Sequence, residues 1–369
     1  MAAGITPFIT LFHWDLPEGL DRRYGGMLSK EEFPLDFENY ARTLFAAIPK
    51  CKHWITFNEP WCSSILGYST AYFAPGRSSD RSRATVGNSA TEPWIAGHNI
   101  ILAHARAVKA YRDEFKAASG GEIGITLNGD ATYPWDPEDP ADVEACDRKI
   151  EFAISWFADP IYFGDYPASM RKQLGDRLPT FTPEEVALVK GSNDFYGMNH
   201  YTANYIKHKP GKPDDDDFLG HLETLFYAKN GDCIGPETQS FWLRPNPQGF
   251  RDLLNWLSKR YGHPKFYVTE NGTSLKGEND MPVEQIVQDD FRVQYFNDYI
   301  NIMAKAVEED GVNVRAYLAW SLLDNFEWAE GYETRFGVTY VDYEHDQKRH
   351  PKKSARSLKP LFDALIKKE

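Results

Sequence analysis

The sequence predicts an α/β fold, a (β/α)8 TIM barrel in which six of the eight βα units are present. Short apolar runs alternate with amphipathic helical patterns along the whole chain, which is typical of a parallel sheet covered by helices. Polar residues follow nearly every one of these runs, as they do at the catalytic end of a barrel. At 369 residues, 42% of them hydrophobic, the chain can form one large barrel or two ordinary domains. We expect a single catalytic domain over residues 1–369.

Six runs have the length and the apolar, partly β-branched composition of buried parallel strands. They are Ile5–Phe12, His53–Phe57, Ile123–Leu127, Asp194–Met198, Lys265–Thr269 and Val314–Trp320.

Helical patterns lie between these strands, and several open with Pro or Asp, which favour a helix start. They are Asp36–Ile48, Pro93–Phe115, Ala145–Phe157, Pro247–Lys259, Asp289–Val307 and Lys353–Lys367. The polar stretches Arg77–Thr91 and Pro210–Asp217 are expected to be exposed loops, and the four aspartates of the second to be solvated.

The number of units does not distinguish a barrel from a doubly wound sheet, because a doubly wound sheet can also have six strands. The placement of the polar residues distinguishes the two folds. Nearly every predicted strand ends in a polar or carboxylate cluster. The clusters are His13-Trp14-Asp15, Asn58-Glu59, Asn128-Gly129-Asp130, Asn199-His200-Tyr201, Glu270-Asn271 and the segment Asp324–Trp328 after the last strand. A doubly wound fold would gather such residues at one switch point, usually with a Gly-rich phosphate turn, and no G-x-G-x-x-G follows a strand here.

Charge and cysteine content exclude several classes of function. The formal net charge is −13 with no basic run, which disfavours nucleic acid or an anionic membrane as a partner. The four cysteines form no C-x-x-C pair or zinc-like cluster, so we expect no metal and no cofactor. Few cysteines, no signal peptide and no membrane-spanning run favour a cytoplasmic protein. No feature of the sequence predicts the oligomeric state.

Two glutamates stand at strand ends far apart in the chain. Glu59 ends Trp54-Ile55-Thr56-Phe57-Asn58-Glu59-Pro60, where Pro60 stops the ladder and is expected to hold Glu59 extended. Glu270 ends Phe266-Tyr267-Val268-Thr269-Glu270-Asn271-Gly272 in the same way. Most glycoside hydrolases use a pair of carboxyl groups that flank the scissile glycosidic bond.

These segments resemble glycoside hydrolase family 1, and within it the intracellular fungal β-glucosidases. Thr56–Pro60 is similar to the family's acid/base signature and Val268–Gly272 to its nucleophile signature. The resemblance implies that Glu59 is the general acid/base and Glu270 the nucleophile of a retaining enzyme, with carboxyl groups about 5–5.5 Å apart. It also implies that the charge of Glu270 raises the pKa of Glu59 until glycosylation removes that charge.

Other site residues follow from the resemblance one at a time. His13, Trp14 and Asn58 match contacts to the sugar hydroxyls, and Asn199 and Tyr201 match a pair beside the nucleophile, with the phenol bonded to Glu270. Trp320, expected to precede a cis peptide bond to Ser321, resembles the aromatic platform under the sugar. Glu327 and Trp328 match the pair that binds hydroxyls opposite the leaving group, and Phe336 is expected either to line the pocket or to pack in the core.

The same residues indicate the substrate. A carboxylate at Glu327 accepts hydrogen bonds from free hydroxyls and would repel the phosphate of a 6-phospho-β-glycoside. The presence of Glu59 argues against the thioglucosidase branch, which dispenses with an acid. We therefore expect a β-glucosidase that hydrolyses terminal β-D-glucosyl residues of cellobiose, cello-oligosaccharides and aryl β-glucosides, in carbohydrate and cellulose catabolism. The glycosylation pattern Asn271-Gly272-Thr273 is interpreted as chance.

The chain departs from the family at its beginning. Its first strand resembles the third strand of the family's barrel, and a Gln and an Arg of the first two units have no counterpart. Unpaired strand edges are costly, so we expect a truncated chain that is inactive as it stands. An active exo-acting β-glucosidase and a catalytically inactive, truncated sugar-binding remnant are the two alternatives.

Overall fold

The computed structural model describes residues 3–365 and divides the chain into two compact units. The first unit contains the residues up to Gly129, then Asp147–Met198 and His208–Glu223. The second contains Asp130–Cys146, Asn199–Lys207 and the residues from Thr224 onward. Each unit is therefore built from three segments that alternate along the chain.

All six predicted strands are present, and they belong to one sheet with the order β1-β2-β3-β5-β8-β9. They are β1 (Phe8–Phe12), β2 (His53–Asn58), β3 (Glu122–Asn128), β5 (Tyr196–Asn199), β8 (Phe266–Asn271) and β9 (Val314–Ala319). The first strand begins at Phe8, which pairs with His53, and not at Ile5 as predicted. Ile5 is 69% exposed, so no burial holds it in the ladder.

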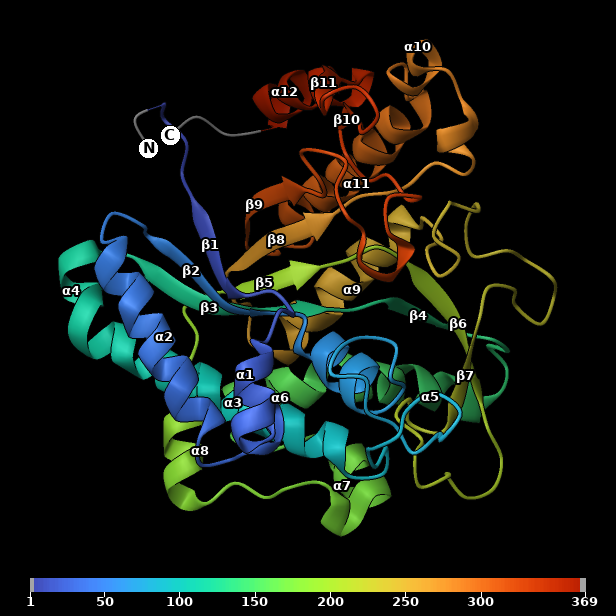
Figure 1. The fold of residues 1–369 in the computed structure, drawn as a ribbon. Helices are drawn as coiled ribbons and strands as arrows, with labels where there is room; N and C mark the ends of the chain where they lie inside the picture. Colours follow the sequence, from blue (N-terminus) through green and yellow to red (C-terminus); the bar gives the residue numbers. More distant parts are fainter. Residues whose placement is uncertain (1–2, 366–369) are drawn as a thin grey trace. The chain divides into compact units, whose positions relative to one another are not determined.

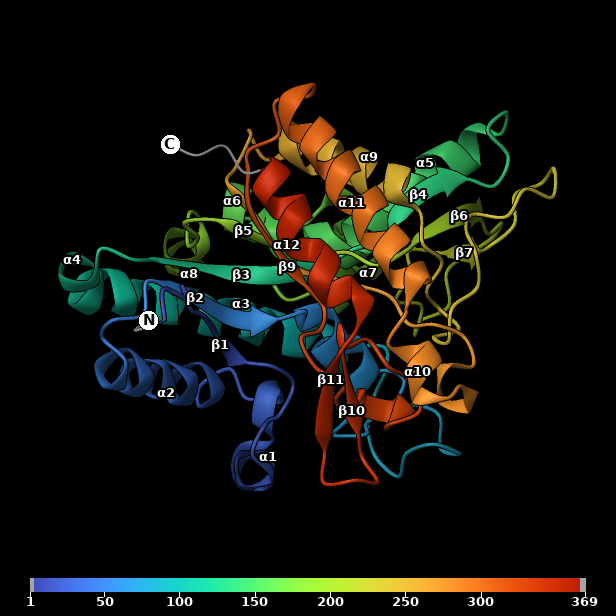
Figure 2. The same cartoon turned by 90° about the horizontal axis from the view of Figure 1, so that it is seen from above.

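The first unit packs helices against β1, β2 and β3, which are parallel and adjacent (Figure 1). The helices α2 (Phe33–Ala47) and α3 (Glu92–Ala110) lie along one face of these strands (Figure 2). Phe37 of α2 stacks on Phe57 with ring centroids 4.2 Å apart. Aromatic stacking of this kind, together with burial of both rings, fixes α2 on the strand that carries Asn58.

Helix α3 is buried on nearly all sides, because 15 of its 19 residues are buried. Its close contact with α6 (Trp156–Phe163) requires a glycine, since a Cβ at Gly97 would lie 2.4 Å from the Trp156 ring. The predicted helix Ala145–Phe157 is part of a longer helical run, α5 (Pro140–Ile150), a π turn (Glu151–Ser155) and α6. Helix α3 similarly continues into a π turn at Tyr111–Phe115.

The second unit contains β8 and β9, which are parallel, and three of the predicted helices. They are α9 (Pro247–Arg260), α11 (Asp290–Glu308) and α12 (Lys353–Leu365). Phe250 of α9 lies against Tyr299 of α11, with centroids 5.7 Å apart. The last two residues of the predicted helix Lys353–Lys367 lie outside the described residues.

Several short elements were not predicted. The strands β4 (Ala131–Pro134), β6 (Ala203–His208) and β7 (Leu222–Leu225) form a three-stranded sheet, and β10 (Thr339–Asp342) and β11 (Lys348–Pro351) an antiparallel pair. The short helices are α1 (Glu18–Tyr24), α4 (Lys116–Ser119), α7 (Ala168–Leu174), α8 (Pro183–Val189) and α10 (Val283–Ile286).

The two predicted loops have no regular structure but are not wholly exposed. In the first, Ser78 and Ser89 are buried, and the Ser89 hydroxyl accepts the Ser79 N–H at 2.8 Å. In the second, the Asp217 carboxylate accepts the His221 N–H at 2.7 Å and the Gln173 amide at 2.7 Å. Most residues of both segments are exposed as predicted, including three of the four aspartates, Asp214–Asp216. The residues that are not exposed differ because their short side chains replace missing backbone partners.

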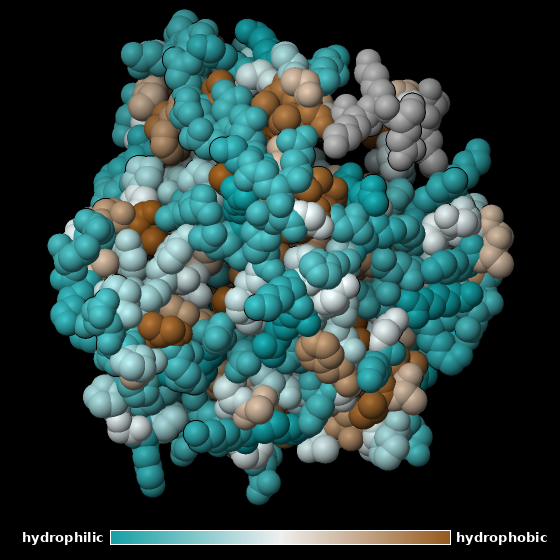
Figure 3. Space-filling view, turned by 180° about the vertical axis from the view of Figure 1, so that it is seen from behind, coloured by the Kyte–Doolittle hydropathy of each residue, from teal (hydrophilic) through white to brown (hydrophobic). Residues whose placement is uncertain are grey.

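The face shown in Figure 3 is mainly hydrophilic, with small and separate hydrophobic patches. The mean hydropathy of the whole chain is −0.54. Over residues 3–365, no helix combines the length and apolar character that crossing a bilayer requires.

Candidate active site

Glu59 follows directly on β2 in the first unit, and its backbone is not extended as predicted. Its φ is +46°, in the left-handed region that residues with a Cβ rarely adopt. Its N–H donates to the Thr126 carbonyl of β3 at 2.9 Å, and its carbonyl accepts the Cys62 N–H at 2.9 Å. The neighbouring strand and the π turn Cys62–Leu66 thus impose a conformation that the preference of a residue before proline does not predict.

Asn58, the last residue of β2, brings three predicted site residues together. Its side-chain amide lies 3.0 Å from His13 Nε2, and its carbonyl accepts the Trp14 indole N–H at 3.0 Å. Burial lowers the pKa of His13 to about 4, so the imidazole is neutral at pH 7. With Asn58 as donor, Nε2 accepts, and the ring proton lies on Nδ1.

The side chain of Glu59 has a partner that the sequence did not predict. The Cys62 thiol donates to Glu59 Oε2 with a sulfur–oxygen distance of 3.2 Å, and both residues are buried. In the sequence, the only indication of this contact is that Cys62 follows Glu59 by three positions. That spacing is too common to predict a hydrogen bond.

Glu270 lies at the end of β8 in the second unit, next to the residues predicted to accompany it. The Tyr201 hydroxyl donates to Glu270 Oε2 at 2.7 Å, as expected. Thr269 donates to Asn199 Oδ1 at 2.7 Å, which fixes the fully buried Asn199 side chain at the end of β5. Strands β5 and β8 therefore present an amide, a phenol and a carboxylate together.

Aromatic rings hold Tyr201 in place. Phe336 contacts its ring edge-on at 6.0 Å, and Trp242 does so at 5.7 Å. Phe336 is only 2% exposed, so its packing against Tyr201 rather than an open pocket defines its position. Trp242 was not predicted, because it lies outside every strand and carries no recognisable motif.

Asn271 is also fixed from within the second unit. Its amide donates to the His200 carbonyl at 2.6 Å and to the Tyr295 hydroxyl at 2.8 Å, and its oxygen accepts from Tyr317. The residue has no exposed surface, so its amide cannot receive a glycan in the folded chain, in line with the interpretation of the sequence pattern as chance.

The segment after β9 carries the remaining predicted residues. The Trp320–Ser321 peptide bond is cis, as expected. The Glu327 N–H donates to the Gly331 carbonyl at 2.7 Å, and Trp328 has φ +47°. Both side chains are half-buried, which leaves part of each accessible to a ligand.

A buried ionic cluster anchors this segment. The Asp324 carboxylate binds Arg335 at 2.6 Å and the Gly337 N–H at 3.0 Å, and Lys352 lies 3.4 Å from it. Lys352 also binds Glu278 at 2.6 Å. The pKa of Glu278 is lowered, because the Arg292 and Lys352 charges outweigh the desolvation that opposes them.

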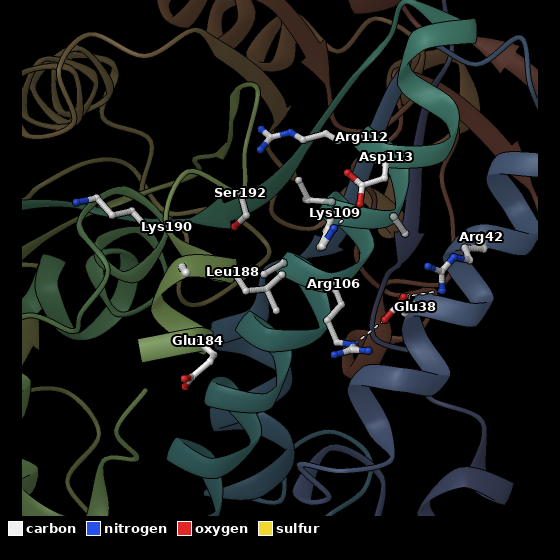
Figure 4. A pocket seen from close by; sticks show the side chains of 14 residues that line it. Glu38, Arg42, Arg106, Lys109, Arg112, Asp113, Glu184, Leu188, Lys190 and Ser192 are labelled. Atoms are coloured by element: carbon white, nitrogen blue, oxygen red, sulfur yellow. Dashed lines mark hydrogen bonds and ion pairs between the residues drawn. The ribbon is translucent and has the colours of Figure 1, made fainter. Parts of the chain in front are cut away.

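The first unit also has a cavity of about 620 Å³ (Figure 4). It is lined by α2, α3, the π turn Tyr111–Phe115, α8 and residues after α8, and by none of the predicted site residues. Arg42 and Arg106 both bind Glu38 there, at 2.5 and 2.6 Å. The charges of these three residues are therefore paired with one another.

Comparisons with known proteins agree with this arrangement. The chain is 55% identical to β-glucosidase 1B of Phanerodontia chrysosporium over 364 residues, covering 98% of this chain and 66% of the relative. It is 83% identical to a β-glucosidase from Humicola insolens solved in complex with glucose, with a TM-score of 0.99, and covers 77% of that chain with all of its own.

A rice β-glucosidase, solved as a mutant in a covalent complex with Glc from GA4GE, is 42% identical, with a TM-score of 0.94. The match covers all of this chain and 77% of the rice protein. The chain thus spans about two thirds to three quarters of the length of these relatives. The model of glycosyl hydrolase family 1 matches residues 1–366, and the chain belongs to that family.

Proposed function

We propose that this chain is a retaining β-glucosidase with Glu270 as nucleophile and Glu59 as general acid/base. The observation that carries the proposal is that, in a family 1 chain, each of these glutamates stands at the end of a parallel strand of one sheet. Parallel strands present their carboxyl ends on the same side of a barrel, where its catalytic residues lie.

Glu270 would attack the anomeric carbon and form a covalent glycosyl intermediate. The hydrogen bond from Tyr201 to Glu270 Oε2 supports this role, since a phenol donor favours the ionised carboxylate and fixes its orientation. Phe336 and Trp242 hold the phenol ring, so that little reorganisation is required during the reaction.

Glu59 would protonate the leaving oxygen in the first step and deprotonate water in the second. Retention requires the two carboxyl groups to lie about 5–5.5 Å apart in the working enzyme. The fixed backbone of Glu59, bonded through both its N–H and its carbonyl, supports such a defined position.

The substrate proposed is a terminal, non-reducing β-D-glucosyl residue of cellobiose, a cello-oligosaccharide or an aryl β-glucoside. His13, Trp14, Asn58 and Asn199 would contact its hydroxyls, Trp320 would stack beneath the ring, and Glu327 and Trp328 would bind the hydroxyls opposite the leaving group. The glucose-bound Humicola structure supports a glucosyl ligand. We further propose that the six βα units correspond to six of the eight units of the family's barrel, and that the chain works in the cytoplasm.

Trapping of the covalent intermediate tests the proposal. The chain is incubated with 2,4-dinitrophenyl 2-deoxy-2-fluoro-β-glucoside, and the labelled peptide is identified by mass spectrometry. We expect one fluoroglucosyl group on Glu270, because the fluorine slows both steps whereas the dinitrophenolate leaving group accelerates only the first, so that the intermediate accumulates. Glu270→Ala is expected to take up no label and to hydrolyse aryl β-glucosides at least about a thousandfold more slowly.

Two results would contradict the proposal. Label on any other carboxylate would remove Glu270 as the nucleophile. A folded chain that binds glucose but neither turns over nor becomes labelled would identify a sugar-binding protein without catalytic activity.

A further inference from the structure

Cys62 contacts Glu59 through two separate groups. Its backbone N–H donates to the Glu59 carbonyl at 2.9 Å, and its thiol donates to Glu59 Oε2 at 3.2 Å. One residue thus binds both the main chain and the carboxylate of Glu59. Oε2 accepts from the thiol whether the carboxyl is ionised or carries its proton on Oε1, the form that acts as the acid, so the thiol is the donor in both states.

The turn that makes this contact possible is tightly constrained. Glu59 has φ +46°, and the π turn begins at Cys62 itself. Thr126 of β3 accepts the Glu59 N–H at 2.9 Å, so the backbone is held from the side of the sheet as well. Cys62 and Glu59 are 7% and 6% exposed, which leaves little competition from solvent for the thiol contact.

We propose that Cys62 is a positioning residue for Glu59: its thiol holds Oε2 and so directs the carboxyl group toward the leaving oxygen. The inference rests on the proposed role of Glu59 as general acid/base. A carboxyl held at one oxygen loses rotational freedom about its terminal bond, and proton transfer depends on that geometry. In this role the thiol acts through Glu59 and not on the substrate itself.

Leaving-group dependence is the readout that separates positioning from simple structural support. The first chemical step, reported by kcat/KM, needs proton donation when the leaving group is poor and needs little of it when the leaving group is good. Phenyl β-glucoside and 2,4-dinitrophenyl β-glucoside represent these two cases. General damage to the fold would lower kcat/KM for both substrates alike.

The experiment compares Cys62→Ala, Cys62→Ser and Ser64→Ala with the unaltered chain. We expect Cys62→Ala to lower kcat/KM for phenyl β-glucoside about tenfold, or about 1.4 kcal/mol, because the hydrogen bond from a thiol to a carboxyl oxygen is a weak one. For 2,4-dinitrophenyl β-glucoside the change should stay below about twofold. Cys62→Ser retains a donor and should recover part of the loss.

Ser64 provides the matched control. It lies in the same π turn and is fully buried, and within residues 3–365 its hydroxyl has no hydrogen-bond partner. Ser64→Ala should leave both rates unchanged. Equal losses on the two substrates in Cys62→Ala and Cys62→Ser, or no loss on either, would overturn the positioning role. An unaltered chain that cleaves neither substrate would instead overturn the proposed function.

Discussion

At the scale of single residues, the Tyr201 hydroxyl is the group whose removal should affect Glu270 most directly. Tyr201→Phe removes the donor to Glu270 Oε2 but keeps the ring between Phe336 and Trp242. A hydrogen bond to a charged group contributes about 1.5–3 kcal/mol, which corresponds to roughly a 10- to 150-fold fall in kcat/KM. The fall is measured as kcat/KM for an aryl β-glucoside in the variant and in the unaltered chain.

Tyr40→Phe is the control for loss of a phenol. Its hydroxyl donates to the Leu11 carbonyl at 2.8 Å, and neither residue belongs to the proposed site. We expect kcat/KM to stay within about twofold of the unaltered chain, since surface substitutions usually cost less than about 0.5 kcal/mol. A similar fall in both variants would mean that Tyr201 supports the fold and not the nucleophile.

The resemblance to family 1 was sufficient to predict the partner of Glu270 but not the surroundings of Glu59. The contact with Tyr201 was implied by two short segments that resemble the family's motifs. The left-handed backbone of Glu59 depends on the Thr126 carbonyl, and the thiol contact depends on where the π turn begins. Both are set by tertiary structure, which no local preference encodes.

At the scale of elements, Gly272 allows β8 and β9 to approach closely. A Cβ there would lie 1.9 Å from the Trp320 carbonyl oxygen. Gly272→Ala must displace the Trp320 carbonyl, so we expect a loss of at least about 3 kcal/mol in the free energy of unfolding. The urea midpoint, followed by circular dichroism, measures it.

The same substitution at Gly19 is the control. Gly19 lies in α1, and a Cβ added there would have no heavy atom within 4 Å. Gly19→Ala should be neutral or stabilise the chain by up to about 1 kcal/mol, because alanine favours helices. A Gly272→Ala variant as stable as Gly19→Ala would contradict the close approach.

Asp324 connects the buried ionic cluster to the segment that carries Glu327 and Trp328. Asp324→Asn removes the negative charge that pairs with the buried cations Arg335 and Lys352. Breaking one partner of a buried ion pair costs about 3–5 kcal/mol, and we expect the free energy of unfolding to fall by that amount. The KM for an aryl β-glucoside should rise at the same time, because the segment loses its anchor.

Asp363→Asn is the matched control, since it breaks an exposed pair with Lys359. Exposed pairs contribute about 0–1 kcal/mol, so neither stability nor KM should change appreciably. If Asp324→Asn lowered stability but left KM unaltered, the cluster would stabilise the fold without positioning the segment.

The long helices and the buried strands of the chain were predictable, and the short, partly exposed strands were not. All six parallel strands stand out as apolar runs, and α9, α11 and α12 as periodic patterns. The strands β4, β7, β10 and β11 have four residues each and are partly exposed, whereas β5 is equally short but wholly buried. Their pairing depends on contacts that become available only in the folded chain.

At the scale of the whole molecule, buried histidines should make stability depend on pH. Burial lowers the pKa of His104 to about 3, and its Nδ1 lies 2.7 Å from the Thr56 hydroxyl. Below about pH 6.5 this histidine binds a proton in the unfolded chain but not in the folded chain. Its contribution to the free energy of unfolding is therefore fully present above pH 6.5 and is lost as the pH falls toward 3. At pH 5 this one residue should cost about 2 kcal/mol relative to pH 7.

Unfolding in urea at pH 7 and pH 5 tests this dependence. His104→Gln should reduce the difference in stability between the two pH values by about 2 kcal/mol. Some difference should remain, because burial also lowers the pKa values of His13 and His98, each to about 4. His263→Gln, which replaces an exposed histidine, should leave the difference unchanged, and an equal effect of both variants would exclude burial as the cause.

The alternation of segments between the two compact units has a consequence for biosynthesis. The first unit needs residues as late as Glu223, while the second already claims residues from Asp130 onward. By the time Glu223 has been made, the ribosome has therefore also made two short segments of the second unit, Asp130–Cys146 and Asn199–Lys207. The apolar surface of the strands before Gly129 stays exposed until the later segments of the first unit have been translated. A chaperone that shields nascent chains is therefore expected to raise the yield of this protein during translation.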